Sequence, residues 1–183
     1  MNRILLIAYT VFLILTGFSY KAQNTEWAVA SSTVLFKIKN AGFTVDGKFG
    51  AINATIVFDE TKNSGNSIEA TIDSKAINTG NGTRDGHLKK EEYFGVDKFP
   101  KIQMKATLFG KETNGTFRGY FKLTIKDKTK EVLVPFSFTH KDGKAVFKGT
   151  FTINRLDYGV GENSMILSDN ATITIEVNVI KKQ

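Results

Sequence analysis

The chain has 183 residues, with 16 glycines, 15 phenylalanines and no cysteine, and its formal net charge is +7. The length is enough for one domain with a sizeable core, and the lack of cysteine excludes disulfide bridges, thiolate metal sites, a cysteine nucleophile and a lipid-modified N-terminal cysteine. The lysines are scattered singly along the chain, which is typical of a solvated surface, so we expect no nucleic-acid partner.

Residues 1–22 differ in composition from the rest and predict a signal peptide, followed by one domain over residues 23–183. Arg3 precedes a short apolar run at 4–15, and small residues follow this run, as in secretory signal peptides. The run is short for a membrane span, and an uncleaved anchor is the alternative. We expect a periplasmic or secreted protein. Removing Arg3 and Lys21 from the net charge of +7 leaves +5, which favours transient contact with an anionic membrane surface.

From Trp27 onward, apolar and polar residues alternate with a period of two, which predicts strands with one buried and one solvated face. The expected strands, in chain order, are 33–39, 52–58, 68–72, 102–108, 117–125, 132–138, 145–153 and 173–179. Turn residues connect several of them, and no helix alternates with the strands. Eight antiparallel strands indicate an all-β protein, either a sandwich or a closed up-and-down barrel.

Small residues on the inward face favour the barrel. They are interspersed among the large apolar residues at Ala54, Ala70, Ala106, Gly119, Ala145 and Gly149. An eight-stranded barrel is just wide enough for one small ligand, and small residues would leave room for it. The alternative is that they only fit the taper of a filled barrel. The wall residues expected to line a lumen are Phe36, Ile38, Ile56, Phe58, Met104, Phe121, Leu123, Phe136, Phe147, Phe151 and Ile153.

The only long interruption of the strand pattern is the segment 78–100. Glycine and asparagine at its start predict a loop, and a helix is expected from about Arg84 to Tyr93, with Thr83 as its N-cap. Asp85 then falls in the first turn, where a carboxylate suits a helix N-terminus. We expect this segment to cover one end of the barrel.

Three polar residues in this segment, Arg84, Asp85 and His87, form the one cluster that suggests chemistry. Histidine oriented by aspartate is a general base, but the only nucleophile nearby in sequence is Thr83. The other interpretations are that the cluster holds the cover in place or contacts a polar ligand group. Two separated histidines without cysteine make a poor metal site, so we expect no metal and no cofactor.

Arg155 is the second unusual polar residue. By strand parity it falls on the same inward face as Ile153. A buried arginine requires a partner, and the candidates are Asp157, Asp85 or an anionic ligand group.

Six sequence elements in a fixed order resemble the YceI-like family of exported lipid-binding proteins. The elements are Trp27 with the strand 32–36, Val45 to Phe49, Thr79 to Asn81 with Arg84 to Leu88, Tyr93-Phe94 with Phe99-Pro100, 123–125 with Thr129-Lys130, and Arg155 to Gly159. The resemblance extends from Trp27 to about Val179. Gly95, Ala76 and Asp127 depart from the family pattern, all in the cover or in turns.

The resemblance implies a lipocalin-like, eight-stranded antiparallel β-barrel with a short helix in the 78–100 connection. It also implies an elongated apolar lumen that holds an isoprenoid chain, and no general catalytic activity. We therefore expect an exported carrier or scavenger of an isoprenoid or another long-chain amphiphile. In this interpretation Arg84, Asp85, His87 and Arg155 meet the polar headgroup or hold the cover.

Two other classes stay open at this point. One is a hydrolase or other enzyme that acts on a lumen-bound lipid through His87 and Asp85. The other is a structural or stress protein whose barrel is filled by its own side chains. The sequence leaves the oligomeric state open, a dimer included.

Overall fold

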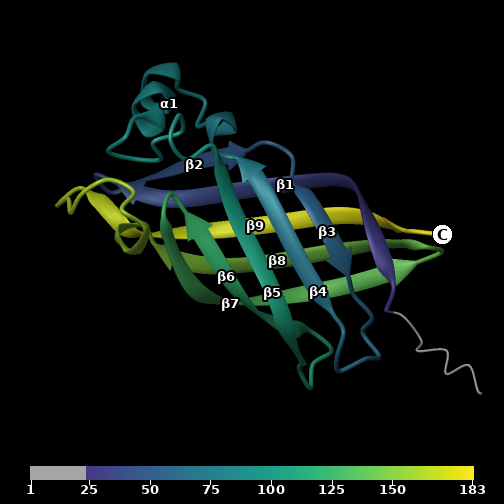
Figure 1. The fold of residues 1–183 in the computed structure, drawn as a ribbon. Helices are drawn as coiled ribbons and strands as arrows, with labels where there is room; N and C mark the ends of the chain where they lie inside the picture. The colour runs from purple at the N-terminus through teal and green to yellow at the C-terminus, as the bar shows by residue number, and fades with distance from the viewer. Residues whose placement is uncertain (1–23) are drawn as a thin grey trace, which may run out of the picture.

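The computed structural model describes residues 24–183, so the predicted signal peptide lies outside the described residues (Figure 1). Most of the described chain is β-strand. The strands are β1 (Glu26–Asn40), β2 (Phe43–Phe49), β3 (Asn53–Val57), β4 (Ser67–Asp73), β5 (Lys101–Lys111), β6 (Phe117–Ile125), β7 (Lys128–Lys141), β8 (Lys144–Asn154) and β9 (Leu167–Lys181). The helices are α1 (Gly82–Lys89) and two short 3₁₀ turns, η1 (Ser74–Ala76) and η2 (Arg155–Tyr158).

The strands close into one antiparallel barrel. Each strand from β3 to β8 pairs with its successor, and β9 returns to β1 along most of its length. The start of β1 pairs with β3 and its second half pairs with β2, so β2 and β3 together fill one position around the barrel. The prediction of an all-β, eight-stranded antiparallel barrel is confirmed, and a sandwich is excluded.

The strand that the sequence analysis did not include is β2. Asp46 and Gly47 at its centre have low strand propensity, and this weakens the sequence pattern. Gly47 pairs with Phe36 of β1, and a Cβ at Gly47 would collide with the Phe36 ring. The glycine is therefore needed because the ring lies across it.

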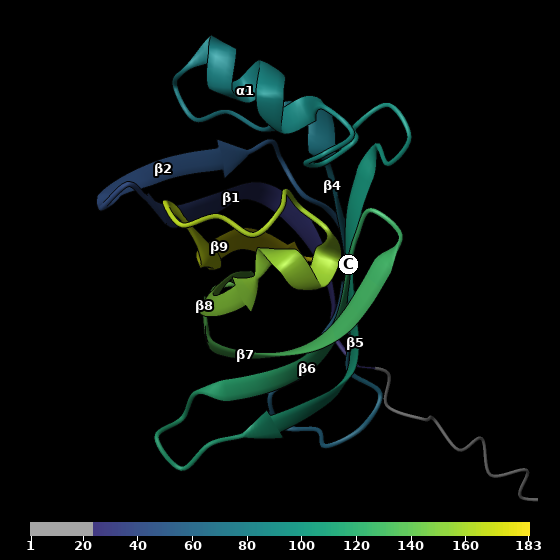
Figure 2. The same cartoon turned by 90° about the vertical axis from the view of Figure 1, so that its left-hand side faces the viewer.

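The cover segment, residues 78–100, lies over the place where β2 and β4 separate (Figure 2). It leaves the end of β4 and returns at the start of β5, where Asp73 pairs with Lys101. The backbones of Lys48 in β2 and Asn78 form an isolated bridge, with N–O distances of 2.8 and 2.9 Å. The cover is thus joined to the barrel wall on both sides of the gap.

Helix α1 is shorter than the sequence predicts, and its cap differs. Asn81, not Thr83, is the N-cap, and its side-chain oxygen accepts a hydrogen bond from the Arg84 amide at 3.0 Å. Asparagine is a stronger N-cap than threonine. Asp85 lies in the first turn as predicted. After Lys89 the chain continues in tight turns, and Gly95 adopts a left-handed conformation with φ of +54°.

The end of the barrel away from the cover is filled by side chains. Phe58 is 1% exposed, and five other phenylalanine rings lie with their centroids 5.0 to 5.7 Å from its own. The indole N–H of Trp27 donates to the Phe58 carbonyl at 2.9 Å. We call this cluster the aromatic floor, and its members are Trp27, Phe58, Phe109, Phe117, Phe121, Phe136, Phe138 and Phe147.

Within residues 24–183, no helix combines the length and the apolar content that crossing a bilayer requires.

We predict that Phe58→Ala lowers the free energy of unfolding by about 3–5 kcal/mol, because it leaves a cavity at the centre of the ring cluster. Urea denaturation measures this change. Phe43→Ala is the control, since Phe43 is 77% exposed and its removal should change stability by less than about 0.5 kcal/mol. Equal effects of the two substitutions would show that the floor is not a packed core.

Candidate ligand-binding cavity

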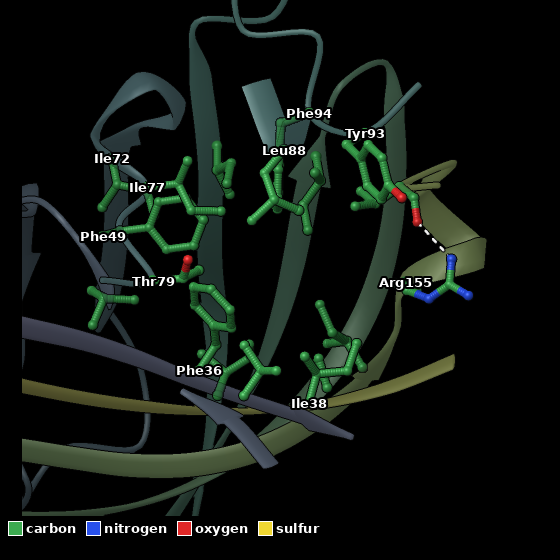
Figure 3. Close-up of a pocket in the computed structure, with 18 of the residues that line it drawn as sticks. Phe36, Ile38, Phe49, Ile72, Ile77, Thr79, Leu88, Tyr93, Phe94 and Arg155 are labelled. Carbon is green, nitrogen blue, oxygen red and sulfur yellow. Dashed lines mark hydrogen bonds between the residues drawn. The ribbon is translucent and has the colours of Figure 1, made fainter. Parts of the chain in front are cut away.

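A cavity of about 500 Å³ lies between the aromatic floor and the cover segment. Its walls come from β1, β2, β4, β5, β6, β8 and β9, and the cover contributes the remaining side (Figure 3). Most of the lining side chains are apolar. The volume falls within the range of about 300–1,000 Å³ that small-molecule sites occupy. The barrel is therefore packed with side chains at the end away from the cover and hollow at the cover end.

The predicted wall residues divide between these two halves. Six line the cavity: Phe36, Ile38, Met104, Leu123, Phe151 and Ile153. Five do not line it and are buried nearer the closed end: Ile56, Phe58, Phe121, Phe136 and Phe147. The period-two pattern identifies the inward face of a strand, but it carries no information about height along the barrel axis.

The small inward residues do not make the lumen in the way that the sequence suggested. Of the six small residues predicted to leave room in the interior, only Ala70 lines the cavity. A Cβ at Gly119 would collide with the Phe121 ring and come within 3.2 Å of the Phe109 ring. Ala106 and Ala145 are 3% exposed within the filled core. At the closed end, these small residues make room for phenylalanine rings.

The cover contributes apolar residues that the sequence analysis did not assign to the site. Leu88, Tyr93 and Phe94 of the cover line the cavity opposite Phe36, together with Ile77 just before the cover (Figure 3). The Phe94 ring meets Phe49 of β2 edge-on, with centroids 5.7 Å apart. The sequence feature that could have identified them is the apolar or aromatic character of Leu88, Tyr93 and Phe94 within an otherwise polar segment.

The cover contributes polar residues to the lining near α1, namely Thr79, Asn81, Thr83, Arg84 and His87. Other polar lining residues are Asn40, Thr71, Gln103 and Arg155 on other elements. Arg84 is half-buried, and it donates from Nε to the Thr79 hydroxyl at 2.8 Å and from Nη2 to the Thr79 carbonyl at 3.0 Å. His87 is exposed. Two potential cations therefore lie on one side of an apolar cavity.

Asp85 does not line the cavity and is bound to Thr79 instead. Its Oδ1 accepts hydrogen bonds from the Thr79 hydroxyl at 2.6 Å and from the Thr79 amide at 2.9 Å. The bond from the hydroxyl, and to a smaller extent the one from the amide, lowers the pKa of the Asp85 carboxyl below its ordinary value. Asp85 and His87 are two residues apart on a helix and do not face one another.

The second histidine is remote from this cluster. His140 Nε2 lies 2.7 Å from Glu60 Oε1, at the outer surface. Among residues 24–183, no group of three or more histidine, aspartate and glutamate side chains could hold a metal ion.

Arg155 is buried, as strand parity indicated, and is 4% exposed in η2. Its carboxylate partner is neither Asp157 nor Asp85. Nη2 pairs with Asp169 Oδ1 at 3.1 Å, and Nε and Nη1 donate to the carbonyls of Ser168 and Val160, each at 3.0 Å. Figure 3 draws one of the Arg155 hydrogen bonds as a dashed line. Asp169 lies on β9, so only the fold brings it to Arg155. The guanidinium borders the cavity, and its hydrogen bonds hold the loop between η2 and β9.

Further contacts fix the cover near its C-terminal end and at its middle. The hydroxyl of Ser74, a residue 1% exposed, donates to the Phe99 carbonyl at 2.7 Å. On the other side, Lys126 Nζ bridges the carbonyls of Glu91 and Gly159, at 2.8 and 2.9 Å. The cover is therefore a defined wall of the cavity.

A family model described as the YceI-like domain matches residues 26–179. The chain belongs to the YceI-like family. A UPF0312 protein of Shewanella sp. strain W3-18-1 is 24% identical over 169 residues, which cover 87% of this chain and 86% of that protein. The resemblance seen in the sequence is confirmed.

Two solved structures show the same fold. Burkholderia cenocepacia BcnA aligns with a TM-score of 0.76 and 22% identity, over 80% of this chain and 95% of that one. A structure described as a polyisoprenoid binding domain from Saccharophagus degradans, implicated in plant cell wall breakdown, aligns with a TM-score of 0.69 and 10% identity. It covers 87% of this chain and 99% of that one.

The hydrogen bonds from Thr79 give a pH-dependent prediction. Because the pKa of Asp85 is lowered in the folded state, its carboxylate stabilises the cover above the ordinary value of 3.8. This stabilisation is lost as the pH falls through the lowered value. We predict that the carboxyl ¹³C resonance of Asp85 titrates below pH 3.8, and that Thr79→Val raises this pKa.

Thr83→Val is the control for this titration, because Thr83 makes no hydrogen bond to Asp85. Its Asp85 should titrate as in the wild type. An Asp85 pKa that is the same in all three proteins would contradict the assigned role of Thr79.

Proposed function

We propose that this protein binds an isoprenoid or a similar long-chain amphiphile in the cavity, as an exported carrier or scavenger and not as an enzyme. The observation that carries the proposal is a cavity of about 500 Å³ with mostly apolar walls and several polar groups on the cover side. A molecule with an apolar chain and a polar end matches this arrangement. Each methylene group of such a chain contributes about 0.8 kcal/mol when it leaves water.

The fold comparison supports the same class of ligand. The Saccharophagus structure with the same fold is described as a polyisoprenoid binding domain. At 10% identity this likeness concerns the fold, so the choice of an isoprenoid depends on the apolar cavity of this chain. Branched prenyl chains and unbranched alkyl chains both suit walls of isoleucine, leucine and phenylalanine.

The polar headgroup is proposed to lie near Arg84 and His87. Arg84 uses Nε and Nη2 to bind Thr79, and its Nη1 has no partner among residues 24–183. This nitrogen is suited to an oxygen acceptor such as a hydroxyl or a phosphate. Arg155 is less suited to the headgroup, because its three nitrogens already bind carbonyls and Asp169.

The arrangement of Asp85 supports a role without catalysis. Its carboxylate oxygen is held by the hydroxyl and the amide of Thr79, so it does not orient the His87 ring as a general base would require. We propose that both residues serve the cover and the headgroup. The expected export is consistent with a carrier, and the net charge of +5 that remains after Arg3 and Lys21 are removed favours contact with an anionic membrane surface, where such ligands reside.

Lipid extraction and native mass spectrometry of protein purified from its own periplasm test the proposal directly. We predict a bound amphiphile, and a large drop in its occupancy in Ala70→Phe, because the new ring fills part of the cavity. Thr55→Phe is the matched control, since Thr55 is exposed on β3 and the added ring stays outside. Empty wild-type protein that also fails to take up added prenols would defeat the proposal.

His87→Ala separates binding from catalysis. If the protein is a carrier, this variant still takes up a neutral prenol, with an affinity lowered by no more than about tenfold, because at most one headgroup contact is lost. Thin-layer chromatography of the recovered lipid should show it unchanged by either protein. The opposite result, conversion of an added prenyl ester by the wild type that disappears in His87→Ala, would establish an enzyme.

A further inference from the structure

The boundary between the cavity and the aromatic floor falls at the same register on three neighbouring strands. On β4, β5 and β6 the last inward residues that line the cavity are Ala70, Met104 and Leu123, and they are cross-strand neighbours. The next inward residues do not line it, and they are again neighbours in register: Ile68, Ala106 and Phe121. On β9 the same change falls between Ile175 and Val177.

The floor at this boundary is closely packed. Phe121 is 5% exposed, its ring lies over Gly119, and its centroid is 6.1 Å from that of Phe109. Phe109 in turn meets Phe58 at 5.7 Å. A ligand chain that reached below Leu123 would therefore have to displace the Phe121 ring from its neighbours. Close-packed interiors resist such displacement.

The strand rise gives the depth of the cavity as measured along β1, a direction that is tilted from the barrel axis. The residues of β1 that line the cavity extend from Val34 to Asn40. Six residue steps at about 3.3 Å each give roughly 20 Å. With carbon–carbon bonds of about 1.5 Å, an extended chain on the order of 15 carbons spans this distance.

We propose that the aromatic floor, with Phe121 as its uppermost ring, sets the length of chain that the cavity accepts at on the order of 15 carbons. Carbons beyond this length stay outside and add nothing to affinity. The inference rests on the proposed function, because it assumes a chain that enters from the cover side. Phe121 is then a specificity-determining residue, although it does not line the empty cavity.

Competition between prenols in native mass spectrometry tests this proposal. Delipidated wild-type protein is offered pairs of prenols of about 10, 15, 20, 30 and 40 carbons, a series that brackets the depth derived from the strand rise. Below the limit, each additional buried methylene should raise affinity by about fourfold. Above it, affinity should be level.

Two variants should move this limit in opposite directions. Phe121→Ala should shift it toward about 20 carbons, because the floor is lowered by the volume of one ring. Leu123→Trp should shift it toward about 10 carbons, because an indole occupies the lowest part of the cavity. The second variant adds volume to an open cavity, so it provides a test that does not depend on the folding of Phe121→Ala.

Phe117→Ala is the matched control. Phe117 is on the same strand and the same inward face as Phe121, and it is 3% exposed, but it lies deeper in the floor, where it stacks on Phe136. Its removal should lower stability and leave the length limit unchanged.

The outcomes separate this inference from the proposed function. A wild-type affinity that keeps rising to 40 carbons, or a limit that neither Phe121→Ala nor Leu123→Trp moves, overturns the length limit and leaves lipid binding intact. An equal shift in Phe117→Ala overturns the role of Phe121. Failure of the wild type to bind any prenol in the series overturns the proposed function itself.

Discussion

The interaction on which the rest of this structure depends is the packing of aromatic rings around Phe58. Phe58 follows directly after β3, and the rings that surround it come from β5, β6, β7 and β8, so the contact crosses the interior of the barrel. Trp27 joins β1 to the same cluster through its hydrogen bond to the Phe58 carbonyl. Ladder hydrogen bonds close the barrel, but they do not fill it. The rings supply the buried apolar area that lets the other half of the barrel stay open.

The opposite side of the cavity is organised by a single threonine. The Thr79 hydroxyl donates to Asp85 and accepts from Arg84, so two charges of opposite sign are bound through one neutral group. The Thr79 amide and carbonyl bind the same two side chains. Because Asp85 is kept as an anion by these bonds, it also balances the Arg84 charge close to an apolar space. The polar cluster suggests an active site from sequence alone, but its observed contacts hold Thr79 to Arg84 and Asp85 within the cover.

The sequence predicted the face of each strand far better than it predicted the site. Alternation is a local property, and it correctly placed Phe36, Leu123 and Phe121 on the inward side. Whether an inward residue meets space or another ring depends on its height, which is set by register between strands far apart in the chain. Leu123 and Phe121 are two residues apart and fall on opposite sides of the boundary.

Pairing between distant parts of the chain also explains the other features that the sequence did not predict. Asp169 reaches Arg155 because β9 lies beside β8, and local sequence carries no signal of this. The strand β2 was missed because Gly47 is selected by the Phe36 ring on the neighbouring strand and not by strand propensity. The motifs of the family resemblance did carry this non-local information, since they include both Gly47 and Arg155.

The way the cover is inserted has a consequence for how such a protein diverges. Asp73 and Lys101, which flank the cover, are paired neighbours in the β4–β5 ladder. The cover is therefore the connecting loop of the β4–β5 hairpin. Its length and chemistry can change while the ladder register stays the same, as surface loops generally tolerate. The aromatic floor belongs to the strands and changes only through the core. The residues proposed to meet a headgroup and those proposed to limit chain length thus lie in separate parts of the chain, and selection can alter one set without the other.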